Sequence, residues 1–145
     1  MKIIKALFLV AFTTLLTGCK SDPEPNELCS HLKLGVELFS DALSKEASPQ
    51  ILDYRSTDDY NKGHIPGAIS MPASTTDLVR ESEYFKKVRE QFSTSKKIFI
   101  YGGTDSWGVN GNVIPGIIAC DWGKDKTILL DGGYNAWVKA GYPTE

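Results

Sequence analysis

Leu52-Asp53-Tyr54-Arg55 ends a short apolar run, and Gly63-His64-Ile65-Pro66-Gly67-Ala68-Ile69 follows it closely in the chain. Gly63 supplies backbone angles that other residues avoid, and Pro66-Gly67 sets a tight turn ahead of the next apolar residues. This order predicts a strand over 50–53, a turn, and another strand over 68–71. The stretch therefore indicates two strands, with a tight turn directly before the second and charged residues where the first ends.

A second ordered string lies near the C-terminus. It reads Leu130-Asp131-Gly132-Gly133-Tyr134-Asn135-Ala136-Trp137 and closes with Ala140-Gly141-Tyr142-Pro143. The glycine pair predicts a turn between a strand over 127–130 and a short helix that holds Trp137. Another apolar run predicts a strand over 97–101, and 36–39 is a candidate fifth strand. Strands that are apolar on successive residues are typical of central strands covered on both faces, so the chain is predicted to be α/β.

Two longer helices are expected between these strands. The first begins after Ser74-Thr75-Thr76, whose hydroxyls can cap free N–H groups, and runs to about Phe92. The second is expected over 113–122. Pro115 is tolerated only in a first turn, which places the start of this helix close to Ile114.

From about Val36 to Pro143 the chain resembles the rhodanese-like domain, and the two quoted strings carry the resemblance. It implies a single α/β domain with a central, mostly parallel sheet flanked by helices. Members of this family usually follow the central strand directly with a nucleophilic cysteine. Backbone N–H groups of a curled loop stabilise its thiolate and persulfide. Here Ile98-Phe99-Ile100-Tyr101 runs into Gly102-Gly103-Thr104-Asp105-Ser106-Trp107-Gly108, which contains no cysteine.

The place of the missing nucleophile depends on the register of this loop. Counted forward from Tyr101 it falls on Gly102, and counted back from Gly123 it falls on Ser106. Both alternatives lack a thiol. Active members often place Arg in the loop to attract thiosulfate, whereas this chain has Asp105. Two like charges about 5 Å apart repel by roughly 3 kcal/mol at an effective dielectric near 20, so the loop disfavours that substrate unless Arg55 reaches into the pocket.

The predicted pocket combines this loop with polar residues near the ends of strands. Its candidates are Gly102, Gly103, Thr104, Asp105, Ser106, Trp107, Gly108, Asp53, Arg55 and His64. Asp53 and Arg55 either line the edge where α/β sheets bind ligands or form an ion pair that holds the loop ends. His64 either titrates near neutral pH or caps its turn. Trp107 either plugs the pocket or presents a flat face to a ligand.

The N-terminal residues resemble a bacterial lipoprotein signal. A charged start and the apolar run Ala6–Leu16, too short to span a bilayer, precede Leu16-Thr17-Gly18-Cys19, which resembles a lipobox. We expect residues 1–18 to be a signal peptide, 19–27 a tether lipidated at Cys19, and 28–145 the rhodanese-like domain. The lack of Asp directly after Cys19 favours the outer membrane, with the domain facing the periplasm.

Charge and export limit the partners and ligands. Removal of residues 1–18 changes the formal charge from -2 to -4, and no basic stripe remains, which argues against a nucleic-acid partner. Export favours a disulfide between Cys29 and Cys120, and two buried thiols fit the same pattern. Cys29 and His31 are the one local ligand-like spacing in the sequence. Two candidates do not make a metal site, so neither a metal nor a cofactor is expected.

Together these features predict a catalytically silent rhodanese-like domain. It would act as a periplasmic binding module at a membrane, with a small anion or a protein as its partner. The alternative is an active sulfurtransferase that moves thiosulfate or persulfide sulfur through a non-standard cysteine, Cys120 or Cys29, or unrelated chemistry centred on Ser106. Cys120 lies among apolar residues, which would raise a thiol pKa and suppress the thiolate.

Overall fold

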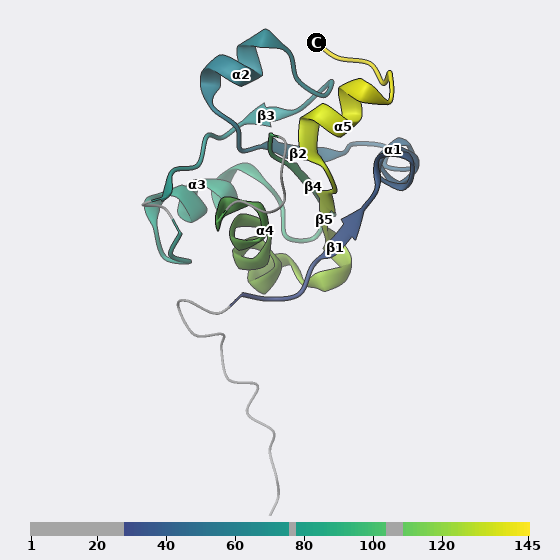
Figure 1. The fold of residues 1–145 in the computed structure, drawn as a ribbon. Coiled ribbons are helices and arrows are strands. Elements are labelled where there is room, and N and C mark those ends of the chain that lie inside the picture. Colours follow the sequence, from purple (N-terminus) through teal and green to yellow (C-terminus); the bar gives the residue numbers. More distant parts are fainter. Residues whose placement is uncertain (1–27, 76–77, 104–108) are drawn as a thin grey trace, which may run out of the picture.

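The computed structural model describes residues 28–75, 78–103 and 109–145 (Figure 1). Strands and helices alternate along most of this chain. The strands are β1 Leu32–Leu34, β2 Gln50–Asp53, β3 Ile69–Ser70, β4 Ile98–Tyr101 and β5 Thr127–Leu130. The helices are α1 Val36–Ser44, α2 Thr57–Lys62, α3 Glu83–Gln91, α4 Val109–Trp122 and α5 Gly133–Lys139, with a 3-10 turn, η2, over Lys124–Lys126.

The strands form one five-stranded sheet in the order β1-β5-β4-β2-β3, and all of its pairs are parallel. Every residue of β4 and β5 is buried. A parallel sheet is covered on both faces, which is why these strands are continuous apolar runs. The expected α/β domain with a central parallel sheet is therefore confirmed.

Side chains of β4 alternate between two hydrophobic clusters, one on each face of the sheet. Ile98 and Ile100 pack with α3 and α4, while Phe99 and Tyr101 pack with α1 and α5. Figure 1 shows the two pairs of helices on opposite sides of the sheet. Because all five strands point the same way, their carboxyl ends meet at one edge, and loops from that edge can converge.

The sequence expectation for the first strand was wrong. Residues 36–39 are not a strand but the start of α1, because Val36, Phe39 and Leu43 follow helical spacing and pack on one face. The edge strand is instead β1, three residues long with the exposed Lys33 at its centre. The strand expected over 68–71 is shorter and comprises only Ile69 and Ser70.

The starts of both longer helices also differ from expectation. Residues 78–82 are not helical, and α3 begins at Glu83 after Ser82, because the Ser82 N–H donates to Val79 O at 2.8 Å and closes a turn first. Helix α4 begins at Val109 rather than near Ile114, and Pro115 lies inside it. Ile114 and the residues that follow are buried on the sheet, and this packing keeps the helix continuous although Pro115 donates no hydrogen bond.

Within the described part of the chain, none of the helices combines the length and apolar character needed to cross a membrane.

Candidate functional site

The candidate site begins where β2 and β4 end side by side. Asp53 pairs in register with Tyr101, so the next residues of the two strands, Tyr54 and Gly102, are neighbours. The Tyr54 N–H donates to Tyr101 O at 3.2 Å, which continues the ladder one step beyond β2. The register therefore fixes where the loop after β4 starts.

Tyr54 fills the space beside Gly102. A Cβ atom added to Gly102 would lie 2.6 Å from both Cζ and Oη of Tyr54, closer than non-bonded atoms approach. Burial, with a further contribution from Asp53, raises the pKa of the Tyr54 phenol to about 12, so the hydroxyl stays neutral at ordinary pH. Any side chain at position 102 would have to displace this ring.

The beginning of α5 holds the first two residues of the loop. The Tyr134 N–H donates to Gly102 O at 2.9 Å. Gly133 has a positive φ of 59°, and a Cβ atom there would overlap the carbonyl oxygen of Gly103. Only glycine permits this close approach, so the glycine pair of the C-terminal string joins the loop start to α5.

Asp53 and Arg55 form a buried ion pair that closes the same edge. Arg55 Nη2 lies 2.6 Å from Asp53 Oδ2, and it also donates to Gly63 O at 2.7 Å. The guanidinium carbon lies 3.9 Å from the centre of the Tyr134 ring. Asp53 is fully buried, and Arg55 is only 9% exposed. The sequence left open whether this pair lines a ligand-binding edge or holds the loop ends together. The geometry favours the second alternative.

Tyr101 belongs to the same buried network. Its hydroxyl accepts a hydrogen bond from the Ile65 N–H at 3.1 Å. Burial, followed by hydrogen bonding and charge interaction with Asp53, raises the pKa of Tyr101 well above its ordinary value. A neutral phenol therefore links β4 to the turn after Gly63.

His64 is engaged by its own turn. The ring stacks on Tyr60 with 3.8 Å between centroids, and Nδ1 lies 3.2 Å from Tyr60 O. Its backbone pairs with Glu145 through two hydrogen bonds of 2.9 Å. These contacts agree with the alternative in which His64 caps the turn.

The structure thus brings Asp53, Arg55, Gly102 and Gly103 to one edge of the sheet. Thr104, Asp105, Ser106, Trp107 and Gly108 lie outside the described residues. Sequence reasoning missed Tyr54 and Tyr134 as members of the site. A glycine directly after a central strand, beside a tyrosine that follows the neighbouring strand, is the signal that could have suggested the first of them.

Cys29 and Cys120 are joined by a disulfide with a Cα–Cα distance of 5.1 Å. The Cys29 N–H also donates to Gly116 O at 3.0 Å, so the segment before β1 lies along α4. Cys120 is two residues from the end of α4, whereas the loop after β4 precedes the start of that helix. The cysteines are therefore at the end of α4 remote from the candidate site.

Comparisons with known proteins agree with the fold. The chain is 28% identical over 102 residues to thiosulfate sulfurtransferase 16, chloroplastic, of Arabidopsis thaliana, a match that covers 68% of this chain and 82% of that protein. It is similar to the crystal structure of the Alr3790 protein from Anabaena sp., with a TM-score of 0.58, 25% identity, and coverage of 77% and 80% of the two chains.

A thiosulfate sulfurtransferase from Pseudomonas aeruginosa is also similar, with a TM-score of 0.58 and 27% identity; the match covers 85% of this chain and 20% of that one. Residues 36–140 match the family described as Rhodanese-like domain. The parallel sheet, the order of its strands and this match together place the chain in the family of rhodanese-like domains.

Proposed function

We propose that this protein is a catalytically silent rhodanese-like domain that binds a ligand or a protein partner at a bacterial membrane. The observation that carries the proposal is at the end of β4. The residue after the strand is Gly102, no cysteine follows through Gly108, and the Tyr54 ring occupies the space that a side chain at 102 would need.

Sulfur transfer in this family needs a persulfide on a cysteine held by backbone N–H groups. Position 102 has no side chain to carry sulfur. At the other register, Ser106 has a hydroxyl, which cannot hold a transferable persulfide. Both registers therefore support a domain that binds without transferring sulfur. Its contact site would be the edge that the buried Asp53–Arg55 pair holds together, where the loop from Gly102 begins.

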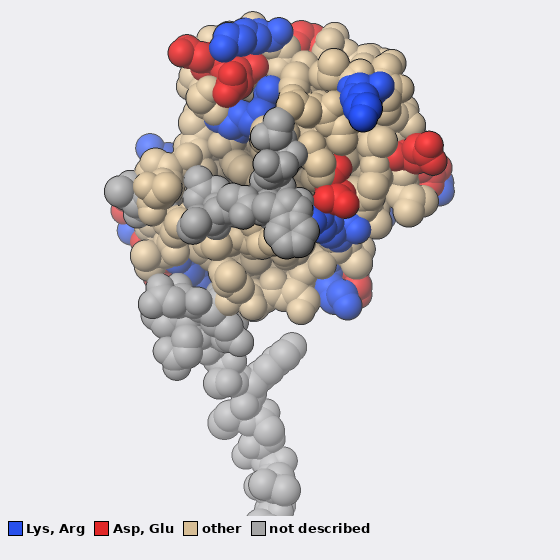
Figure 2. Space-filling view, viewed as in Figure 1, with Lys and Arg blue, Asp and Glu red and all other residues tan. Residues whose placement is uncertain are grey.

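The membrane location rests on the lipobox-like Leu16-Thr17-Gly18-Cys19. On the face shown in Figure 2, Lys and Arg are interspersed with Asp and Glu, which supports a protein or small-anion partner over nucleic acid. The intact mass of the purified native protein tests the anchor. We expect a mature chain that begins at acylated Cys19, and Cys19→Ala should release the domain from the membrane. An unmodified N-terminus elsewhere contradicts the anchor.

The alternative is a sulfurtransferase that uses a non-standard cysteine, and the names of two relatives favour it. It requires Cys29 or Cys120 as a thiol. The two sulfur atoms are bonded to each other in the structure, and Cys120 lies at the far end of α4 from the loop. The disulfide would have to be reduced and α4 rearranged before either sulfur reached Gly102.

An assay of sulfur transfer from thiosulfate to cyanide separates the two functions. The oxidised protein, the reduced protein and a Cys29→Ser/Cys120→Ser variant are compared with an active thiosulfate sulfurtransferase. We expect no turnover above background in any of the three. Turnover that appears on reduction and is lost in the double variant would establish the alternative. Turnover that survives the double variant would refute the claim that the loop is silent.

A further inference from the structure

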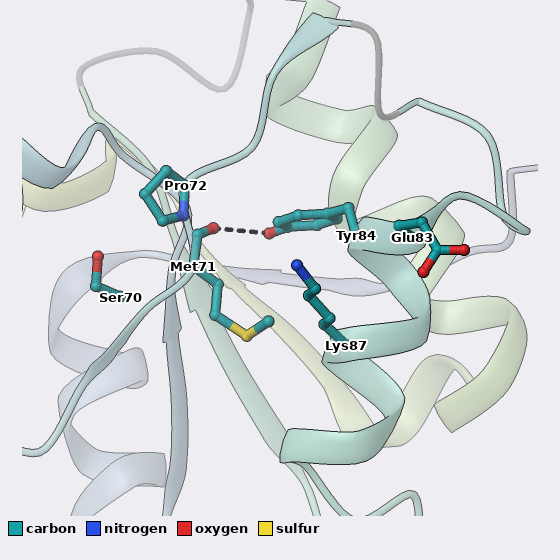
Figure 3. Close-up of a pocket in the computed structure, with 6 residues that line it drawn as sticks. All are labelled: Ser70, Met71, Pro72, Glu83, Tyr84 and Lys87. Atoms are coloured by element: carbon teal, nitrogen blue, oxygen red, sulfur yellow. Dashed lines mark hydrogen bonds between the residues drawn. The ribbon is translucent and has the colours of Figure 1, made fainter.

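A groove lies between the end of β3 and helix α3. Its volume is about 370 Å³, and it is lined by Ser70, Met71, Pro72, Glu83, Tyr84 and Lys87 (Figure 3). The Tyr84 hydroxyl donates to Met71 O at 2.9 Å and ties the two walls together. The volume falls at the small end of the range for ligand pockets, enough for one or two side chains.

Among the described residues, Lys87 forms no ion pair within 4 Å, and its charge contributes, after that of Lys86, to lowering the pKa of Glu83. Figure 3 shows the Lys87 ammonium directed toward the space between Met71 and Tyr84, while the Glu83 carboxylate points away from it. Glu83 is instead paired with Lys86 at 2.6 Å on the exposed side of α3. The groove therefore combines an apolar wall with an ammonium group that no carboxylate of the described residues contacts directly, which suits a carboxylate on a hydrocarbon stem.

The groove also lies beside an open edge of the sheet. Among the strands of the described residues, β3 is the last in the order and pairs only with β2. The Met71 N–H donates inward to Asp53 O at 2.8 Å. Successive N–H groups of an extended strand point to opposite sides, so the backbone groups of Ser70 face outward. An extended chain could therefore bond to Ser70 while its side chain enters the groove.

From these features we infer that the groove binds an extended, acidic segment of a partner protein. A Glu or Asp side chain of that segment pairs with Lys87, its stem packs on Met71 and Tyr84, and its backbone bonds to Ser70 at the edge of β3. Charge complementarity and the open strand edge select this partner. The inference names a partner chemistry for the proposed binding role but uses none of the residues 102–108, so it holds whether or not the domain transfers sulfur.

Peptide binding to the purified full chain tests the inference. The probe is a fluorescent Val-Glu-Val-Glu-Val peptide with blocked ends, titrated by anisotropy at low salt, and the comparison peptide carries Lys in place of Glu. We expect the acidic peptide to bind and the basic one not to. Lys87→Gln should weaken binding by up to about fivefold, the equivalent of ~1 kcal/mol for an exposed charge pair. Lys87→Glu should reverse the preference and favour the basic peptide.

Lys86→Gln is the matched control, because Lys86 is the neighbouring lysine on α3 and already pairs with Glu83. It should leave affinity unchanged. Equal losses from Lys86→Gln and Lys87→Gln, or equal binding of both peptides, would overturn the inference. So would failure of the acidic peptide to bind, or N-acetylglutamate binding as tightly as the peptide, because the open edge would then contribute nothing. A sulfur-transfer assay of Lys87→Gln keeps this result separate from the question of catalysis.

Discussion

Substitutions of Tyr54 and Gly102 should have strongly non-additive effects on the free energy of unfolding. The reason is that the Tyr54 ring occupies the space where a side chain on residue 102 would lie. The perturbation is a double-mutant cycle of Tyr54→Ala and Gly102→Ala. In the wild-type background the new methyl group would lie 2.6 Å from two atoms of the tyrosine ring. In the Tyr54→Ala background the same methyl group enters vacated space.

The size of the coupling follows from these contacts. Overpacking of a filled site destabilises by about 1–3 kcal/mol, so Gly102→Ala alone should cost roughly 2 kcal/mol. Without the ring, the same change should be neutral or should stabilise by about 0.5 kcal/mol, because alanine restricts the unfolded chain. Gly102 has no positive φ to oppose this gain. The expected coupling energy is therefore about 2 kcal/mol, well above the ~0.5 kcal/mol scatter of independent sites.

Urea unfolding followed by tryptophan fluorescence, with the disulfide intact, measures all four proteins. Gly103→Ala is the matched control, because an added Cβ atom there meets nothing within 4 Å. It should show no coupling to Tyr54→Ala. If the Gly102 and Tyr54 changes add within error, the ring does not fill the position after β4, and the main support for a silent site is lost.

Four further outcomes are expected. Gly102→Cys combined with Tyr54→Ala should give a thiol with a pKa below the free value of about 8.5, measured by alkylation rate against pH; an unshifted value would show that the loop forms no amide cradle. Non-reducing peptide mapping should recover Cys29 linked to Cys120, and Ser at both positions should lower the free energy of unfolding by about 4.6 kcal/mol for a loop of 91 residues. Arg55→Met should destabilise by about 3–5 kcal/mol in urea, because it leaves a buried carboxylate unpaired, whereas a loss under 1 kcal/mol would contradict the clamp. Because the Tyr54 pKa rises from 10.0 to about 12 on folding, its contribution should be complete below pH 10 and be lost as pH rises through 12; Tyr54→Phe should remove that part of the pH dependence of unfolding.

The fold could be predicted where a sequence pattern has one structural meaning. β2, β4 and β5 are apolar on successive residues and lie between turn residues, and the sequence placed each of them within a residue. β1 was missed because it has only three residues, with the exposed Lys33 in the middle, and so short a segment shows almost no hydrophobic periodicity. The start of α3 was misplaced because Ser82 and the earlier hydroxyl residues are equally good caps, and tertiary contacts decide between them.

The candidate site could be predicted only in part. The charged residues Asp53 and Arg55 were expected at the end of β2, because a strand end is a local property of the sequence. That Tyr54 fills the space at Gly102 depends on the register between β2 and β4, and that Gly133 contacts Gly103 depends on where α5 packs. These are non-local contacts, which a single sequence does not specify.

Because of the disulfide, the chain between Cys29 and Cys120 and the chain after Cys120 would respond differently to mechanical force. A force applied between Leu28 and Glu145 would be transmitted from Cys29 through the disulfide to Cys120, so the chain between the two cysteines would not carry it. Only the segment after Cys120 could be pulled out, to a fully extended length of roughly 90 Å, whereas the reduced chain from Leu28 to Glu145 could reach about 400 Å. That extensible part contains β5 and α5, including Tyr134, which holds Gly102. In single-molecule stretching, tension on the oxidised domain should therefore release the start of the loop while β2 and β4 remain shielded from the load.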